Sequence, residues 1–383
     1  MITGHGGNVQ VLAQQHRCSI DEITDMSSNI NPLGPPDGLE QFISANIHLI
    51  RSLPQPDAMD MVEAFSRYYK VPADRVIGGN GTTWFIYTLP AALKSKKVLI
   101  VGPTYADYRD GCIMNNVPFE FCMSDKEHMF QPDINKISEM AKNSDTVIIC
   151  NPNNPTGSLI PLNSIIELLQ RHPETYFVID ESYLPFLPDA EEISLVSQRS
   201  FPNLIVLSSM SKIFRIPGLR TGYLCADPAI IEKFMRYYQP WSVNALSQAA
   251  IIHILENSEE IAPFLDMTRS FVQEEKKIFE NALNGFNDPY NCAISSHSSH
   301  SSHSSYGCSG LKLYPAHTYF ILAELTGNIK SHELCRRLGD HKILIRDCEN
   351  FHGLSDRFVR FSLRDRHSNM TLVSILKNIV GGN

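Results

Sequence analysis

The sequence has no long apolar run and no basic tract. No stretch approaches the ~20 apolar residues that a membrane-spanning helix needs, and 33 Lys and Arg face 41 Asp and Glu, for a net charge of −8. An acidic chain without clustered lysines or arginines is a poor ligand for nucleic acids or anionic membranes. We therefore expect neither as a partner.

The chain also lacks a paired cysteine motif. Its nine cysteines are scattered without a Cys-x-x-Cys pair, and an odd, unpatterned set fits reduced thiols better than disulfides or zinc. The first residues, Met-Ile-Thr-Gly-His-Gly-Gly-Asn, do not resemble a signal peptide. We expect a cytoplasmic protein without a metal site.

A short segment around Lys212 carries the strongest chemical signal. An apolar run, 204–207, predicts a buried strand, after which Ser209 and Lys212 follow, with Arg220 eight residues further on. A lysine amine forms a Schiff base with an aldehyde, and Arg with Ser binds a phosphate through charge-assisted hydrogen bonds. An aldehyde and a phosphate together describe pyridoxal 5′-phosphate (PLP). Alone, Lys212 would more often be a solvated surface residue.

A glycine-rich turn offers a second phosphate contact. Gly78-Gly79-Asn80 leads into Gly81, Thr82 and Thr83, and a helical pattern follows from Trp84. Glycines allow close approach of the backbone, and free amides at a helix start bind anions. Such a turn is weak evidence by itself, because most are only turns.

Two further predicted strands end in polar residues. The strand 146–150 runs into Asn-Pro-Asn-Asn-Pro-Thr-Gly, which includes Asn154, and the strand 176–179 runs into Asp180 and Tyr183. A carboxylate at the end of a buried strand needs a partner, and opposite a pyridine nitrogen it keeps that nitrogen protonated. The alternative for Asp180 is a helix N-cap.

Strands alternate with helical segments through this part of the chain, which predicts an α/β fold with a mainly parallel sheet. The motifs fall at the carboxyl ends of predicted strands, where open α/β sheets bind ligands. A chain of 383 residues exceeds one compact core. We expect an N-terminal arm with part of a small domain (1–35), a large cofactor-binding domain (36–242), and a smaller α+β domain (243–383).

The lysine, glycine-rich, asparagine and aspartate motifs together resemble fold-type I PLP enzymes of the aminotransferase class I/II group. The resemblance implies that Tyr105 stacks on the pyridine ring, that Asn154 and Tyr183 contact the phenolic oxygen, and that Asp180 meets the ring nitrogen. It also implies a homodimer, and a catalytic Lys212. The cofactor phosphate would be bound by Gly81, Thr82, Thr83, Ser209 and Arg220.

Three segments, 5–34, 240–245 and 345–354, resemble the decarboxylases of threonine phosphate within this group. The resemblance implies that His5, Asn29 and Arg346 bind the substrate phosphate. Arg360, with Asn154, would bind the carboxylate. A partly buried arginine inside a strand needs an anion, which agrees with these assignments. The product would be an amino-alcohol phosphate for the cobamide nucleotide-loop linker.

Several alternatives stay open. Histidinol-phosphate aminotransferases resemble the chain broadly, and a non-catalytic binding protein of this fold is conceivable. L-serine phosphate and L-threonine phosphate differ by one methyl group, which a pocket discriminates by only about 1–3 kcal/mol. Leu53 and Trp84 replace the tyrosine and glutamate usual in the group, which could alter the pocket. The Ser-Ser-His tract 295–305 could bind metal, although a surface loop is expected.

Overall fold

The computed structural model describes residues 6–198, 201–284, 307–308 and 310–381. His5 and the tract 295–305 lie outside the described residues. The chain divides into two compact units. Unit 1 contains residues 1–32, 155–157 and 271–383, and unit 2 contains residues 33–154 and 158–270.

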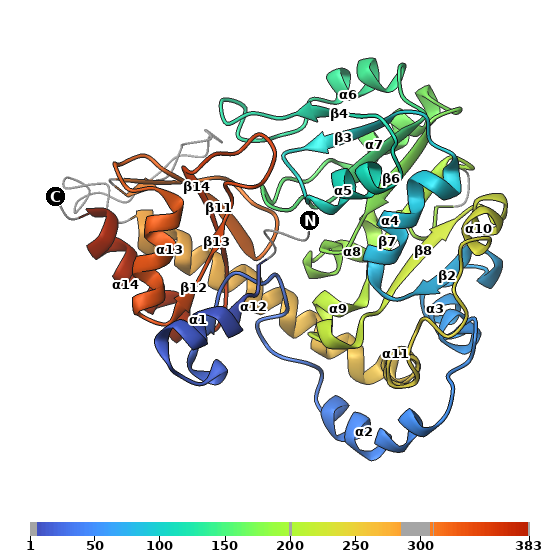
Figure 1. Cartoon of the computed structure of the whole chain (residues 1–383), viewed down its shortest axis with the longest axis horizontal. Helices are drawn as coiled ribbons and strands as arrows, with labels where there is room; N and C mark the ends of the chain where they lie inside the picture. Colours follow the sequence, from blue (N-terminus) through green and yellow to red (C-terminus); the bar gives the residue numbers. More distant parts are fainter. Residues whose placement is uncertain (1–5, 199–200, 285–306, 309, 382–383) are drawn as a thin grey trace, which may run out of the picture. The chain divides into compact units, whose positions relative to one another are not determined.

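Unit 2 is built on a seven-stranded sheet, drawn in light blue to yellow-green in Figure 1. Its spatial order is β2-β8-β7-β6-β5-β3-β4. The strands are β2 (Val76–Gly79), β3 (Val98–Gly102), β4 (Phe119–Met123), β5 (Thr146–Cys150), β6 (Tyr176–Asp180), β7 (Leu204–Ser209) and β8 (Gly222–Ala226). Apart from β4 and the first residue of β6, their residues are buried, which explains their nearly continuous apolar sequences.

The directions of the strands determine which strand ends lie at the same edge of this sheet. β3, β4, β5, β6 and β7 are parallel to one another, whereas β8 is antiparallel to both β7 and β2. β2 therefore has the direction of the parallel strands. The carboxyl ends of these six strands and the amino end of β8 share one edge.

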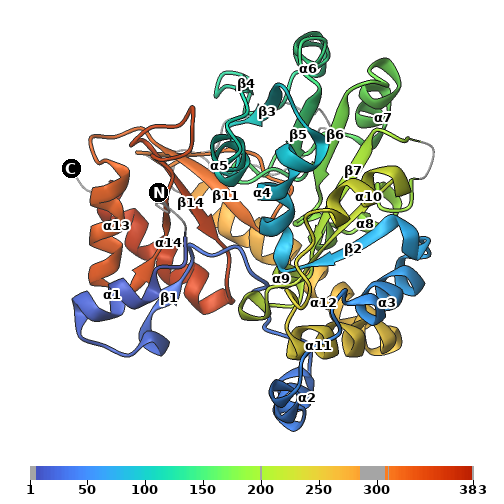
Figure 2. The same ribbon diagram turned by 45° about the vertical axis from the view of Figure 1, so that its right-hand side comes forward.

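Helices cover the strands of unit 2. α4 packs against α5, α10 and β7, while α6 packs against α7, β3 and β4; Figure 2 shows α4 in front of the sheet. The helices are α2 (Leu39–Ala45), α3 (Met59–Tyr69), α4 (Gly81–Leu93), α5 (Asp107–Met114), α6 (Ile134–Ala141), α7 (Leu162–Arg171), α8 (Ala190–Ile193), α9 (Met210–Ile213), α10 (Pro228–Met235) and α11 (Ala245–Glu256). Short 3-10 turns are η2 (Ile47–Arg51), η3 (Ala73–Arg75), η4 (Leu184–Phe186) and η5 (Pro217–Leu219).

One expected boundary differs from the division into units. The expected small domain begins at residue 243, but residues 243–270 belong to unit 2. The reason is packing, because α11 lies against α3 and α2. α12 (Ser258–Asn284) then begins in unit 2 and ends in unit 1.

Unit 1 combines a five-stranded antiparallel sheet, ordered β13-β14-β11-β10-β9, with a parallel pair, β1 and β12. Its helices are α1 (Val9–His16), α13 (Ser331–Asp340) and α14 (Arg366–Gly381), with η1 (Ile20–Glu22). The strands are β1 (Thr24–Asp25), β9 (Gly307–Cys308), β10 (Leu311–Leu313), β11 (Phe320–Leu325), β12 (Ile343–Leu344), β13 (Arg346–Asp347) and β14 (Phe358–Ser362). Apolar side chains of the sheet, α12, α13 and α14 form one core.

The predicted α/β architecture with a mainly parallel sheet is confirmed. Among the described residues, no helix combines the length and apolarity needed to span a bilayer.

Candidate active site

A cavity of about 160 Å³ lies at the edge of the unit 2 sheet where the strand ends meet. The structure brings all ten predicted cofactor residues to its wall: Gly81, Thr82, Thr83, Tyr105, Asn154, Asp180, Tyr183, Ser209, Lys212 and Arg220. Four residues that the sequence reasoning did not assign also line it: Tyr108, Cys150, Ser182 and Ser211. Strand direction explains the assembly. Most of these residues follow a carboxyl end, and Arg220 precedes the amino end of the antiparallel β8.

One end of the cavity is suited to a phosphate. α4 begins at Gly81, which has φ 73°, and Arg220 Nη2 lies 3.4 Å from Thr83 Oγ1. A Cβ atom on Gly81 would lie 2.8 Å from Arg220 Nη2, and one on Gly222 would lie 2.6 Å from the Thr82 amide nitrogen. A side chain at either position would therefore be too close to these groups. Because both residues are glycines, the Arg220 guanidinium and the backbone amides at the start of α4 can lie close to one bound anion.

Lys212 lies in the short helix α9, directly after β7. The neighbouring Ser211 fixes this turn, because its hydroxyl donates to the Thr221 carbonyl at 3.2 Å and accepts from the Thr221 amide at 3.4 Å. The turn that carries Lys212 is therefore hydrogen-bonded to Thr221, the residue before β8. Lys212 itself lines the cavity.

Asp180 ends β6 and is buried, with both carboxylate oxygens accepting hydrogen bonds. Ser182 donates to Oδ1 from its amide at 2.9 Å and from its hydroxyl at 2.5 Å, and Tyr108 donates to Oδ2 from its hydroxyl at 2.8 Å. Burial raises the pKa of Asp180, whereas the bonds from Ser182 and Tyr108 and the Lys212 charge act against this rise. The site therefore surrounds a buried carboxyl group with donors that favour its charged form.

Two loops of the cavity are joined through Asn153. Its side-chain Nδ2 donates to the Pro103 carbonyl at 2.8 Å, and its side-chain Oδ1 accepts from Thr104 Oγ1 at 2.7 Å. These bonds connect the loop that carries Tyr105 with the loop that carries Asn154. These bonds thus fix the spacing between the loops after β3 and β5, and hence between Tyr105 and Asn154.

Glu181 follows Asp180 and lines a different cavity of about 440 Å³. Its carboxylate accepts from the Leu195 amide and the Ser194 hydroxyl, each at 2.7 Å. Burial raises its pKa to about 7, against these two bonds. Successive residues of an extended chain point to opposite sides, and this alternation is a signal that could have identified the second buried carboxyl group.

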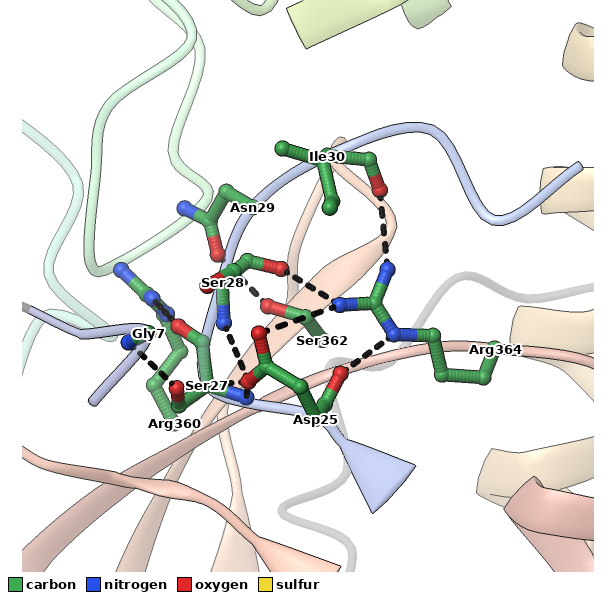
Figure 3. A network of polar contacts seen from close by, with 9 residues as sticks. All are labelled: Gly7, Asp25, Ser27, Ser28, Asn29, Ile30, Arg360, Ser362 and Arg364. Atoms are coloured by element: carbon green, nitrogen blue, oxygen red, sulfur yellow. Dashed lines mark hydrogen bonds and ion pairs between the residues drawn. The ribbon is translucent and has the colours of Figure 1, made fainter. Parts of the chain in front are cut away.

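Unit 1 holds the predicted substrate residues Asn29 and Arg360 close together (Figure 3). Arg360 is buried in β14, donates to the Ser27 carbonyl at 2.5 Å and lies over the Phe320 ring at 5.3 Å. The Asn29 side-chain oxygen accepts from the Ser362 hydroxyl at 2.6 Å. The loop that carries Asn29 is therefore attached to the strand that carries Arg360.

A second arginine, Arg364, fastens the same loop (Figure 3). It donates to the backbone carbonyls of Asp25, Ser28 and Ile30, and its guanidinium lies 3.8 Å from the Asp25 carboxylate. The carboxylate in turn accepts from the Ser27 amide at 2.8 Å and the Ser28 amide at 3.1 Å. Arg364 thus has a structural role in this unit.

Arg346, the third predicted substrate residue, lies in β13 directly opposite Arg360 in β14. Residues directly opposite in antiparallel strands share one face of the sheet. Arg346 donates to the Asn350 side chain at 2.6 Å and lies over the Phe351 ring at 5.0 Å. Burial lowers its pKa, and the charge of Arg360 adds to this effect. Two neighbouring guanidinium groups favour an anionic ligand.

Comparisons with known proteins agree with this geometry. The family model for aminotransferase class I and II matches residues 21–379. Threonine-phosphate decarboxylase of Salmonella typhimurium is 29% identical, with 99% of this chain and 97% of that protein covered. The crystal structure of L-threonine-O-3-phosphate decarboxylase from Porphyromonas gingivalis matches with 28% identity and a TM-score of 0.79, over 94% of this chain and 100% of that one.

Histidinol-phosphate aminotransferase from Clostridium acetobutylicum matches with 27% identity and a TM-score of 0.79, over 94% and 100% of the two chains. The predicted fold type and the predicted resemblance to decarboxylases are confirmed, and the broader likeness to aminotransferases is present as well. Among the described residues, no group of three or more His, Cys, Asp or Glu side chains could hold a metal ion.

Glu181 makes stability depend on pH. Its pKa is about 7 in the folded chain against an ordinary 4.5, so the folded state holds more protons than the unfolded state between these values. The free energy of unfolding should therefore fall by about 3 kcal/mol as pH rises through this interval. Glu181→Gln can keep an oxygen acceptor for the Leu195 amide, while its NH2 group can donate to the Ser194 hydroxyl. Because Gln does not titrate, this variant should flatten the fall. Urea unfolding at several pH values between 4.5 and 8 measures it.

The exposed Glu192→Gln on α8 is the matched control and should retain the fall seen in the unaltered protein. Equal pH dependence in both variants would contradict the assignment to Glu181.

Proposed function

Because the chain belongs to the aminotransferase class I and II family, we propose that it is a PLP-dependent carboxy-lyase acting on a phosphorylated amino acid. The substrate is L-threonine O-3-phosphate or L-serine O-phosphate, and the product is an amino-alcohol phosphate for the cobamide linker. The observation that supports this proposal most strongly is the arginine pair of unit 1, in a chain whose unit 2 has a cavity lined by all ten predicted cofactor residues. A substrate with both a phosphate and a carboxylate needs two cations.

The cavity residues fit PLP by their donor chemistry. Arg220 and the start of α4 suit its phosphate, Asp180 suits its ring nitrogen, and Asn154 with Tyr183 suits its phenolic oxygen. Tyr105 supplies an aromatic face. When bound, PLP supplies an electron sink for the electron pair released at Cα.

The protein's own residues then direct the reaction. Lys212 would bind the aldehyde through its amine, and its ε-ammonium form would donate the proton that replaces the carboxylate at Cα. Arg360 and Asn154 hold the carboxylate, while Arg346, Asn29 and His5 hold the phosphate. By fixing both ends of the substrate, these residues would select which bond at Cα breaks.

A histidinol-phosphate aminotransferase is the second candidate, favoured by the match to the Clostridium acetobutylicum enzyme. Histidinol phosphate has a phosphate and no carboxylate, so it uses one arginine of the pair. The co-substrate of such an aminotransferase, 2-oxoglutarate, has two carboxylates, which would pair with both arginines. The two functions differ in products, which makes them separable by assay.

The first prediction is the reaction itself. Incubation of purified protein and PLP with L-threonine phosphate or L-serine phosphate should release CO2 and an amine phosphate in equal amounts. Radiometric CO2 capture and mass spectrometry measure the two products. Formation of a keto product that depends on 2-oxoglutarate, without CO2, would favour the aminotransferase instead.

The second prediction is the attachment of PLP to Lys212. The purified protein should have a visible absorption band, and borohydride should fix PLP on the peptide that contains Lys212, as read by mass spectrometry. Lys212→Ala should abolish this attachment. Lys233→Ala is the control, since that amine is bound to the Tyr176 hydroxyl at 2.6 Å and lines no part of the cavity. Label on Lys233 or elsewhere would contradict the assignment.

The third prediction separates substrate phosphate from cofactor binding. Arg346→Ala should leave the visible spectrum unchanged and lower kcat/KM for the phosphorylated substrate by about one to two orders of magnitude, the effect of one charged hydrogen bond. Unphosphorylated threonine should lose much less. Arg220→Ala should instead weaken PLP retention for every substrate.

The exposed arginine of α13, changed in Arg336→Ala, is the matched control and should alter neither quantity. An equal loss with phosphorylated and unphosphorylated substrates would mean that Arg346 does not bind the phosphate.

The fourth prediction is a homodimer. Large apolar side chains are exposed along η2 and the residues after it, with Ile50 at 67% and Leu53 at 77%. Exposed apolar side chains so close in sequence suit a partner surface. Sedimentation velocity should give twice the mass of the 43.1 kDa chain. The double variant Ile50→Glu and Leu53→Glu should be monomeric, whereas Ile113→Glu on α5 should not; a monomeric unaltered protein would contradict the proposal.

We also place the protein in the cytoplasm. The cysteines that support this are free thiols: Cys18, Cys112, Cys122, Cys150, Cys225, Cys335 and Cys348. Free, mostly buried thiols suit a reducing compartment.

A further inference from the structure

We propose that Tyr108 is a positioning residue that holds the Asp180 carboxylate in its working orientation for the cofactor. The inference rests on the proposed use of PLP. Tyr108 is the second residue of α5, and it reaches from the connection after β3 to the last residue of β6. Its hydroxyl donates to Asp180 Oδ2 at 2.8 Å.

Tyr108 and Ser182 share the two oxygens of this carboxylate. Ser182, two residues along the chain, donates twice to Oδ1, while Tyr108, 72 residues away, donates to Oδ2. Donors on both oxygens prevent the carboxylate from rotating about its Cβ–Cγ bond. Each ionised oxygen accepts more than one hydrogen bond, so a further donor such as a pyridinium N–H can be accommodated.

The environment of this pair makes the bond strong. Tyr108 is 1% exposed and Asp180 is 4% exposed. A hydrogen bond to a charged group is strengthened where water is excluded. Burial favours the neutral carboxyl by raising the pKa of Asp180, and the Tyr108 hydroxyl opposes that rise. Tyr108 therefore helps to keep a negative charge at this end of the cavity.

A buried tyrosine needs a partner for its hydroxyl in any core, and Tyr223 shows this simpler case. Tyr223 is fully buried and donates to the Met61 carbonyl at 3.0 Å. Tyr108 differs because its partner is a charged cavity residue and because it lines the cavity itself. Its ring also meets the edge of the Tyr105 ring, at 5.8 Å and 86°. Tyr108 thus contacts two predicted cofactor residues.

The test compares Tyr108→Phe with Tyr223→Phe, since each removes one buried hydroxyl. PLP affinity is measured by titrating the PLP-free protein, and the midpoint of the visible band is measured against pH in the loaded protein. Tyr108→Phe should raise the PLP Kd roughly tenfold to a hundredfold, the range for one charged hydrogen bond, and shift the midpoint. Tyr223→Phe should leave the Kd within about twofold, as a bond to a backbone carbonyl outside the cavity should not affect it.

A double-mutant cycle tests whether the effect passes through Asp180. In an Asp180→Asn background, Tyr108→Phe should change the Kd little further, since the charge it stabilises is gone. Ser182→Ala provides a second variant, which should shift the band midpoint in the same direction as Tyr108→Phe. If Tyr108→Phe folds poorly, the band midpoint of Ser182→Ala still tests whether donors to Asp180 control the cofactor.

The outcomes separate this inference from the proposed function. If the unaltered protein binds PLP and Tyr108→Phe matches Tyr223→Phe in Kd and midpoint, the positioning role is overturned alone. An equal loss of affinity in the Asp180→Asn background would also overturn it, because the role would then be general packing. If the unaltered protein binds no PLP, the proposed function fails, and this inference fails with it.

Discussion

The direction of the strands in the seven-stranded sheet is the constraint on which the cavity depends. Four of the strands that end at the cavity, β3, β5, β6 and β7, are parallel, and β2 shares their direction because two antiparallel steps through β8 separate it from them. Reversing β8 would carry Arg220 to the opposite edge, away from the start of α4. The cation and the helix amides meet because one strand runs against the others.

Much of this arrangement was predictable, because its signals are local. β5 was expected at 146–150 and is Thr146–Cys150, and the strand expected at 176–179 is β6, Tyr176–Asp180. The contact between Tyr108 and Asp180 was not predictable. It depends on β3, β5 and β6 being neighbours, and a periodic pattern fixes strands without fixing their order. The unit boundary falls after residue 270 rather than at residue 243 for a similar reason, since α11 packs on helices that precede it by almost 200 residues.

The two units stabilise charges of opposite sign. Unit 2 buries a carboxyl group, Asp180, and surrounds it with hydroxyl and amide donors. Unit 1 places two guanidinium groups opposite each other, and turns backbone carbonyls and aromatic faces toward them. In each case neutral dipoles contribute to stabilising the charge.

The attachment of residues 24–30 to β12 and β14 has a consequence for how the chain is made. Thr24 pairs with Ile343, and Arg364 bonds to the Asp25 backbone across 339 residues. During synthesis the ribosome has finished every strand of unit 2 long before it reaches residue 364. Residues 24–30 therefore remain without these partners while all the strands of unit 2 are already available for folding. Closing so long a loop is slow compared with local folding, so the arginine pair and its loop should be completed after unit 2 has folded.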